Sequence, residues 1–109
     1  MSCILIIGAG SAGSVVAKKC IQQPNIFTTI HVASRTYSAC EQLKEQCQNK
    51  INIHQLDADI IDDTIHLIRS IQPKLVINMA LPYQDLAIME ACLQTQTHYM
   101  DTANYEPKD

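Results

Sequence analysis

All three glycines of this 109-residue chain lie in one short window, from Gly8 to Gly13, with Gly10 between them. An uninterrupted apolar run from Cys3 to Ile7 precedes the window, and a segment of helical character follows it. A strand, a glycine-rich turn and a helix in this order make up the dinucleotide-binding fingerprint. The window therefore predicts a phosphate-binding turn near the start of an α/β domain.

Short apolar runs alternate with segments of helical period to the end of the chain. We expect strands at Cys3–Ile7, Thr29–Ala33, Ile51–Leu56, Leu75–Met79 and His98–Thr102. We expect helices at Ser11–Gln22, at Tyr37–Gln48, from Ile61 to a stop at Gln72 and Pro73, and at Gln84–Thr95. Each strand–helix–strand crossover is right-handed and returns the chain in the same direction. The pattern thus predicts a Rossmann-like, doubly wound parallel sheet of five strands in the order 3-2-1-4-5.

Composition narrows the class of protein. Hydrophobic residues make up 47% of the chain and charged residues 17%, as in globular domains whose central strands are covered on both faces. The formal charge of -3 provides no basic surface for nucleic acid, and no segment approaches the roughly 18 apolar residues of a membrane span. The N-terminus lacks the basic region and cleavage site of a secretory signal. We expect one cytoplasmic domain over residues 1–109 that binds neither nucleic acid nor membrane.

The glycine turn assigns a role to each of its members. In such turns the first glycine, here Gly8, permits the reversal after the strand, and the second, Gly10, lets the backbone approach a pyrophosphate. The third, Gly13, allows the helix to pack closely on the strand. Backbone N–H groups around Ser11 and Ala12 would then point at the phosphates, assisted by the helix dipole. The alternative is a turn with a packing role alone.

The end of the second expected strand indicates which dinucleotide binds. An NAD site usually places Asp or Glu there, about 20 residues after the glycines, to accept hydrogen bonds from the ribose 2′-hydroxyl. This chain has Ser34, Arg35 and Thr36 instead. A guanidinium suits a 2′-phosphate, and the two hydroxyls can donate further hydrogen bonds. The cofactor is predicted to be NADP(H); the alternative is that Arg35 is a solvated surface residue.

Three further residues follow the third expected strand, Asp57, Ala58 and Asp59. In folds of this type they border the adenine pocket. Aspartate is also a preferred helix N-cap, so either aspartate could instead cap the next helix, which is an equal alternative for Asp59.

Ala80, Leu81 and Pro82 follow the fourth expected strand. They lie beside the topological switch point, where ligands bind outside the carboxyl ends of the strands. Small residues there would let the nicotinamide ribose approach.

The cysteines and histidines do not predict a metal centre. The five cysteines are odd in number and contain no CxxC pair, so reduced and mostly buried thiols are expected. Cys40 and Cys47 are spaced to share a helix face, but no nearby histidine completes a zinc ligand set. The four histidines are scattered along the chain and are interpreted as packing or surface residues: His31, His54, His66 and His98.

With these segments placed, the chain resembles the N-terminal NADP-binding domain of the saccharopine dehydrogenase-like family, and within it the branch of carboxynorspermidine dehydrogenases. The resemblance covers nearly the whole chain. The glycine motif is shared with many families, whereas ALPYQD, from Ala80, and DTANYEP, from Asp101, are much more specific. The matching stretches are 6–17, 33–36, 57–59, 76–86 and 99–107.

The resemblance implies an oxidoreductase that condenses aspartate β-semialdehyde with a diamine, diaminopropane or putrescine, and reduces the imine with NADPH in polyamine biosynthesis. It also implies a homodimeric enzyme whose larger catalytic domain follows Asp109 and holds most of the substrate-binding residues. No catalytic residue is therefore assigned within this chain. Two other functions remain open, a saccharopine dehydrogenase or reductase of lysine metabolism and a non-enzymatic NAD(P)-sensing domain.

Overall fold

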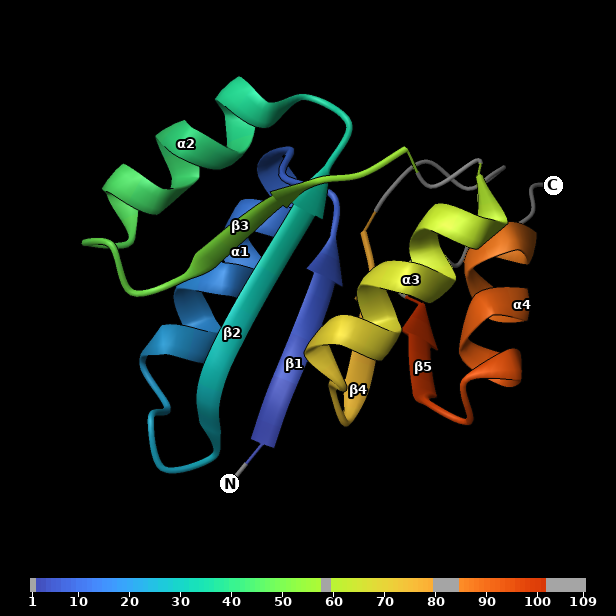
Figure 1. Ribbon diagram of the computed structural model, residues 1–109. Coiled ribbons are helices and arrows are strands. Elements are labelled where there is room, and N and C mark those ends of the chain that lie inside the picture. The colour runs from blue at the N-terminus through green and yellow to red at the C-terminus, as the bar shows by residue number, and fades with distance from the viewer. Residues whose placement is uncertain (1, 58–59, 80–84, 102–109) are drawn as a thin grey trace, which may run out of the picture.

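A computed structural model describes residues 2–57, 60–79 and 85–101, which form a five-stranded parallel sheet between two layers of helices (Figure 1). The strands are β1 Ser2–Ile7, β2 Phe27–Ser34, β3 Asn52–Gln55, β4 Leu75–Asn78 and β5 His98–Asp101. The helices are α1 Ser11–Ile21, α2 Tyr37–Gln46, α3 Ile61–Ile71 and α4 Asp85–Gln94. The strand order is β3-β2-β1-β4-β5 and every pair is parallel, which confirms the predicted architecture.

Local chemistry sets the start of β2 and the end of α3. β2 begins two residues before the expected Thr29, because the Phe27 N–H donates to the Gln23 carbonyl at 2.9 Å and the strand then pairs with β1 from Ser2 onward. α3 ends where expected: Gln72 has a φ of 55°, and Pro73 cannot continue the helix. The stop signal in the sequence was therefore interpreted correctly.

β1 is the centre of the molecule and is covered on both faces. Ile4 and Ile6 point to one face and Leu5 and Ile7 to the other, and all four are at most 2% exposed. Successive side chains of a strand alternate between faces, so a strand with helices on both sides must be apolar throughout. The unbroken apolar run before the glycines is the consequence.

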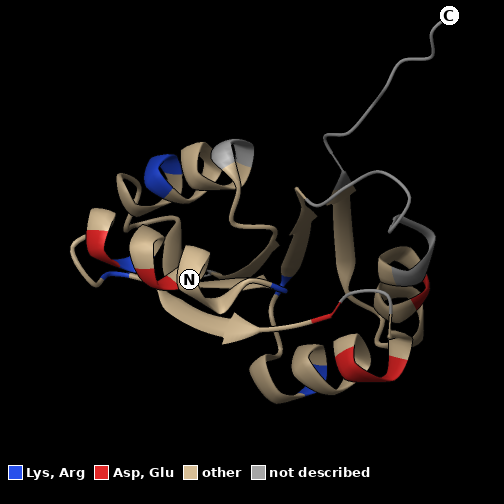
Figure 2. Cartoon of the chain, turned by 90° about the horizontal axis from the view of Figure 1, so that it is seen from above, with Lys and Arg blue, Asp and Glu red and all other residues tan. Residues whose placement is uncertain are grey.

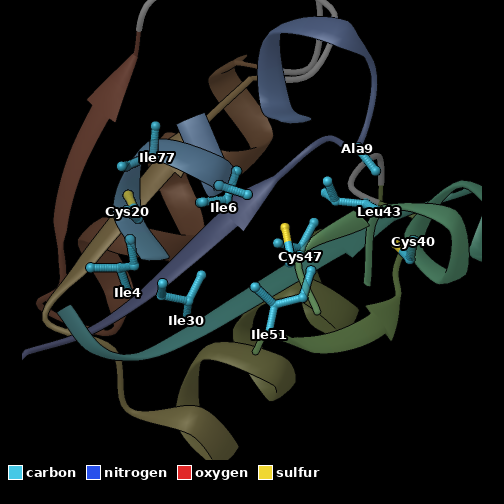
Figure 3. Close-up of a cluster of buried hydrophobic side chains, with 12 residues drawn as sticks. Ile4, Ile6, Ala9, Cys20, Ile30, Cys40, Leu43, Cys47, Ile51 and Ile77 are labelled. Carbon is cyan, nitrogen blue, oxygen red and sulfur yellow. The ribbon is translucent and has the colours of Figure 1, made fainter. Parts of the chain in front are cut away.

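Each face has its own core. On the first face, β1 and β2 pack against α1 and α2, with Ile30, Cys20, Leu43 and Cys47 among the buried side chains (Figure 3). On the second face, α3 and α4 pack on β1 and β4 through residues such as Ile68. Within the described ranges, no helix is long and apolar enough to cross a membrane.

Two histidines that are far apart in the sequence form a pair across β2 and β3. His31 Nδ1 lies 2.9 Å from His54 Nε2, and the two rings stack with centroids 5.1 Å apart. Burial lowers the pKa of both imidazoles below the ordinary value, and His54 lowers that of His31 further. The interpretation of these residues as packing or surface residues agrees with their half-buried side chains, but the sequence did not indicate that they bond to each other.

The pair predicts a loss of stability in acid. Because the folded-state pKa of both histidines is lowered, the unfolded chain binds more protons as the pH falls through about 6.5, the ordinary imidazole value. The free energy of unfolding should therefore have its full value above that pH and decrease as the pH falls below it. Urea unfolding of wild type and His54→Gln between about pH 8 and pH 5 checks this, since the variant loses one titrating group and should show a shallower decrease. His66→Gln, at an exposed position on α3, is the control; a shallower decrease in that variant as well would contradict the assignment.

Candidate functional site

The carboxyl ends of β1 and β4 mark the point where the sheet changes winding direction. From β1 the chain continues through α1 to β2 on one side, whereas β4 lies on the other side of β1. Figure 2 shows the molecule from above in the view of Figure 1, the side toward which β1 and β2 point. Ligands of open α/β sheets bind at such a switch point, so the loops after β1, β2, β3 and β4 are the candidate site.

Gly8 makes the reversal after β1. Its φ of 114° lies in a region that L side chains rarely adopt. The same residue donates its N–H to the Ala33 carbonyl at the end of β2, at 2.8 Å. The turn is thereby fixed to the neighbouring strand.

Gly13 is where α1 meets that turn. A Cβ at this position would lie 2.0 Å from the Gly8 carbonyl oxygen and 2.9 Å from the Gly8 carbonyl carbon. Since both contacts are with backbone, no side-chain movement can relieve them. The third glycine therefore allows the first turn of α1 to pack directly on the end of β1.

Gly10 differs from the other two, because a Cβ built there has no atom within 4 Å. It is the N-cap of α1, with φ -74°, and it has no side chain that could accept from the first N–H groups of the helix. The first turn also contains no acidic residue. The turn therefore presents backbone donors, from Ser11 onward, and the positive end of a helix dipole to open space, an arrangement that suits an anion.

Ser34, Arg35 and Thr36 lie together at the carboxyl end of β2 and lead into α2. The Thr36 N–H donates to Ser34 Oγ at 3.2 Å, and Gln55 Nε2 on β3 donates to the Arg35 carbonyl at 3.3 Å. Thr36 is the N-cap residue of α2, but its hydroxyl does not cap the helix. The backbone of this loop is thus held from two sides, while the guanidinium extends toward solvent.

Asp57, at the end of β3, is brought to Arg35. Its Oδ1 lies 3.4 Å from Arg35 Nη2. The side chain of Asp57 is 42% exposed and that of Arg35 is 62% exposed. A cavity of about 240 Å³ opens beside Asp57 between the end of β3 and α3, with Leu56 and Leu67 among its walls. The structure therefore places one basic and one acidic side chain, from neighbouring strands, side by side at the candidate site.

Five of the predicted site residues lie outside the described ranges: Ala58, Asp59, Ala80, Leu81 and Pro82. The alternative of an aspartate cap for α3 is wrong for this structure, because the N-cap position is taken by Ile60 without a side-chain cap. Ile60 occupies it because its N–H and the Asp57 carbonyl form a turn at 3.0 Å that directs the chain into the helix.

A buried amide at the end of β4, bonded to a half-buried tyrosine, was missed by the sequence interpretation. Asn78, the last residue of β4, is fully buried, and its Nδ2 donates to Tyr99 Oη on β5 at 3.1 Å. Buried amides are costly unless they are hydrogen-bonded. The sequence did contain a signal for this residue, because Asn78 is the single amide within an otherwise apolar strand, just before the candidate site.

The thiols provide no reactive group at this edge. Four of the five cysteines are buried and Cys3 is half-buried, and none of these five forms a disulfide. Burial raises the pKa of the Cys92 thiol to about 11, which keeps it protonated at neutral pH. In the part of the chain that the structure describes, no three His, Cys, Asp or Glu side chains gather as metal ligands do.

Comparison with known proteins identifies relatives of this domain. The model of the saccharopine dehydrogenase NADP binding domain family matches residues 4–109. A carboxyaminopropylagmatine dehydrogenase of Synechocystis sp. is 46% identical over 110 residues, covering 100% of this chain and 27% of its own length. A carboxynorspermidine synthase of Vibrio cholerae is 39% identical over 109 residues, covering 92% of this chain and 26% of its own length. This chain therefore spans about a quarter of these curated relatives.

Solved structures agree on the fold. The apo saccharopine dehydrogenase (L-Glu forming) of Saccharomyces cerevisiae superposes with a TM-score of 0.75 at 16% identity, covering 98% of this chain and 23% of that one. A dTDP-glucose 4,6-dehydratase of Bacillus anthracis in complex with NAD gives the same TM-score at 16% identity, with 93% and 36% covered. At such low identities the similarity establishes the Rossmann-like fold and no specific ligand contact.

Proposed function

Because this chain belongs to the saccharopine dehydrogenase NADP binding domain family, we propose that its glycine turn and the loop after β2 hold NADP(H) at the carboxyl edge of the sheet. The observation that carries the proposal is Arg35, which stands where NAD-binding domains usually carry a carboxylate. The resemblance noted in the sequence and the family match agree on this cofactor.

Each loop has a separate part of the cofactor to bind. The pyrophosphate lies against Gly8, Gly10 and Gly13, and the N–H groups of Ser11 and Ala12 donate to it. The open space above Gly10 leaves room for this approach.

The adenosine half lies over the ends of β2 and β3. Arg35 pairs with the 2′-phosphate, and the hydroxyls of Ser34 and Thr36 donate to it. Asp57 borders the adenine together with Ala58 and Asp59, and the cavity beside Asp57 supports this assignment.

The nicotinamide half lies over the end of β4. Its ribose is flanked by Ala80, Leu81 and Pro82, because these residues follow β4 in the sequence and β4 borders the switch point. When bound, NADPH supplies a hydride; this domain binds and orients it.

For the whole protein, we propose reduction of an imine formed between aspartate β-semialdehyde and an amine, in the manner of polyamine biosynthesis. The support is the identity of 39% to 46% with a carboxynorspermidine synthase and a carboxyaminopropylagmatine dehydrogenase. Those two names imply amines of different size, a diamine in one case and agmatine in the other. The substrate-binding residues and the dimer contacts lie in the remainder of the enzyme, of which this domain is one part.

An NADPH-oxidation assay tests the proposed reaction. The purified full-length protein is given NADPH and aspartate β-semialdehyde with diaminopropane, putrescine or agmatine in turn, and the saccharopine-pathway substrates in a separate arm. We expect NADPH consumption that requires both the aldehyde and one of the three amines, with the secondary amine identified by mass spectrometry. Turnover with saccharopine-pathway substrates alone would move the protein to lysine metabolism, and NADPH binding without any turnover would favour a sensing domain.

A further inference from the structure

Arg35 does not meet the cofactor as an isolated cation. Asp57 Oδ1 lies 3.4 Å from its Nη2, and the two residues come from the ends of the adjacent strands β2 and β3. We propose that Asp57 is a specificity-determining residue, whose carboxylate competes with the 2′-phosphate for Arg35 and so reduces the preference for NADPH over NADH. The inference rests on the proposed function, in which Arg35 binds that phosphate.

The competition follows from charge and exposure. A 2′-phosphate carries nearly two negative charges and presents oxygens that match the guanidinium fork. The contact between Arg35 and Asp57 is long by comparison, and each of the two side chains is more than a third exposed, so solvent weakens their attraction. The phosphate therefore wins the guanidinium. The Asp57 carboxylate then remains within a few ångströms of the bound phosphate, and two negative charges at that distance repel each other. NADH has a neutral hydroxyl at the same position and does not experience this repulsion.

The alternative role for Asp57 is to position Arg35, and the loop contacts argue against it. The Arg35 carbonyl accepts from Gln55 Nε2 at 3.3 Å, and the Thr36 N–H donates to Ser34 Oγ at 3.2 Å. These two bonds hold the loop without the carboxylate. Removal of the charge at Asp57 should therefore relieve the repulsion and leave the backbone that carries Arg35 in place.

Asp57→Asn tests the inference, because the amide keeps the size of the side chain and removes its charge. The dissociation constants of NADPH and NADH are measured for the full-length protein by nicotinamide fluorescence at low salt. Adenine is common to both cofactors, so any contact of Asp57 with adenine cancels in the ratio of the two constants. We expect the preference for NADPH over NADH, expressed as the ratio of the two constants, to rise on the order of threefold to fivefold, with the gain reduced at high salt.

Two further variants make the result specific. Asp62→Asn removes the same charge from an exposed position in the first turn of α3, outside the cavity beside Asp57, and should leave the ratio unchanged. In an Arg35→Ala background, Asp57→Asn should raise the NADPH preference less than in the wild-type background, because the competition for the guanidinium is gone and only the repulsion between the carboxylate and the phosphate remains.

The outcomes separate this inference from the proposed function. If Arg35→Ala weakens NADPH but Asp57→Asn lowers the NADPH preference or leaves it unchanged, the competition is overturned and the phosphate site stands. If Arg35→Ala does not affect NADPH, the phosphate site itself is overturned, and the inference with it.

Discussion

Gly13→Ala is expected to destabilise the fold and abolish NADPH binding together. The added Cβ would lie 2.0 Å from the Gly8 carbonyl oxygen, so either α1 moves off the sheet or the turn after β1 opens. Both changes disturb the buried contacts that Ala17 and Cys20, on the inner face of α1, make with the core. Overpacking of this kind, against rigid backbone, costs about 3 kcal/mol. Urea unfolding and an NADPH titration measure the two effects.

Gly10→Ala is the matched control, since it adds the same methyl group three residues earlier in the same turn. No atom lies within 4 Å of the new Cβ, and the φ of -74° suits alanine. The free energy of unfolding should change by less than about 1 kcal/mol. NADPH affinity should nevertheless decrease by about tenfold or more, equivalent to ~1.4 kcal/mol, because the methyl group enters the space assigned to the pyrophosphate. A Gly13→Ala protein as stable as wild type, or a Gly10→Ala protein with unchanged affinity, would contradict these roles.

Arg35→Asp is expected to reverse the cofactor preference. The change removes the guanidinium and places a carboxylate where NAD-binding domains usually carry one. NADPH should bind on the order of 100-fold more weakly, since a charge-assisted pair is replaced by repulsion. NADH should bind as well as before or better. Titration of both cofactors measures the ratio.

The control for this reversal is Arg69→Asp, the same charge change on an exposed residue in the last turn of α3. It lies at the opposite end of that helix from Asp57 and should leave the ratio of the two dissociation constants unchanged. An equal effect of both substitutions would mean that Arg35 acts only through net charge, and the assignment of a 2′-phosphate site would fail.

The layout of the fold could be predicted because its signals are local. The apolar run of β1 ends just before Gly8, Pro73 follows the last turn of α3, and that helix buries Ile65 and Ile68 at the helical period. Each of these signals lies within a few residues of the structure that it determines. The strand order then follows from the handedness of the crossovers.

The contacts between strands could not be predicted in the same way. Arg35 pairs with Asp57, 22 residues away, and His31 pairs with His54, 23 residues away. Such pairs depend on the register of β2 against β3, which the alternation of polar and apolar residues does not define when β3 is short and half-exposed. The sequence therefore indicated Arg35 and Asp57 as separate site residues, and only the structure brought them into contact.

In the proposed function, preference for NADPH depends on recognition of the cofactor's 2′-phosphate at the end of β2. This recognition is tested most directly by calorimetric titration of the wild-type protein with two adenosine fragments, 2′,5′-ADP and 5′-AMP, which differ only by that phosphate. We expect 2′,5′-ADP to bind at least about tenfold more tightly, a difference of ~1.4 kcal/mol, and to displace NADPH. Equal affinity for the two fragments would contradict the claim.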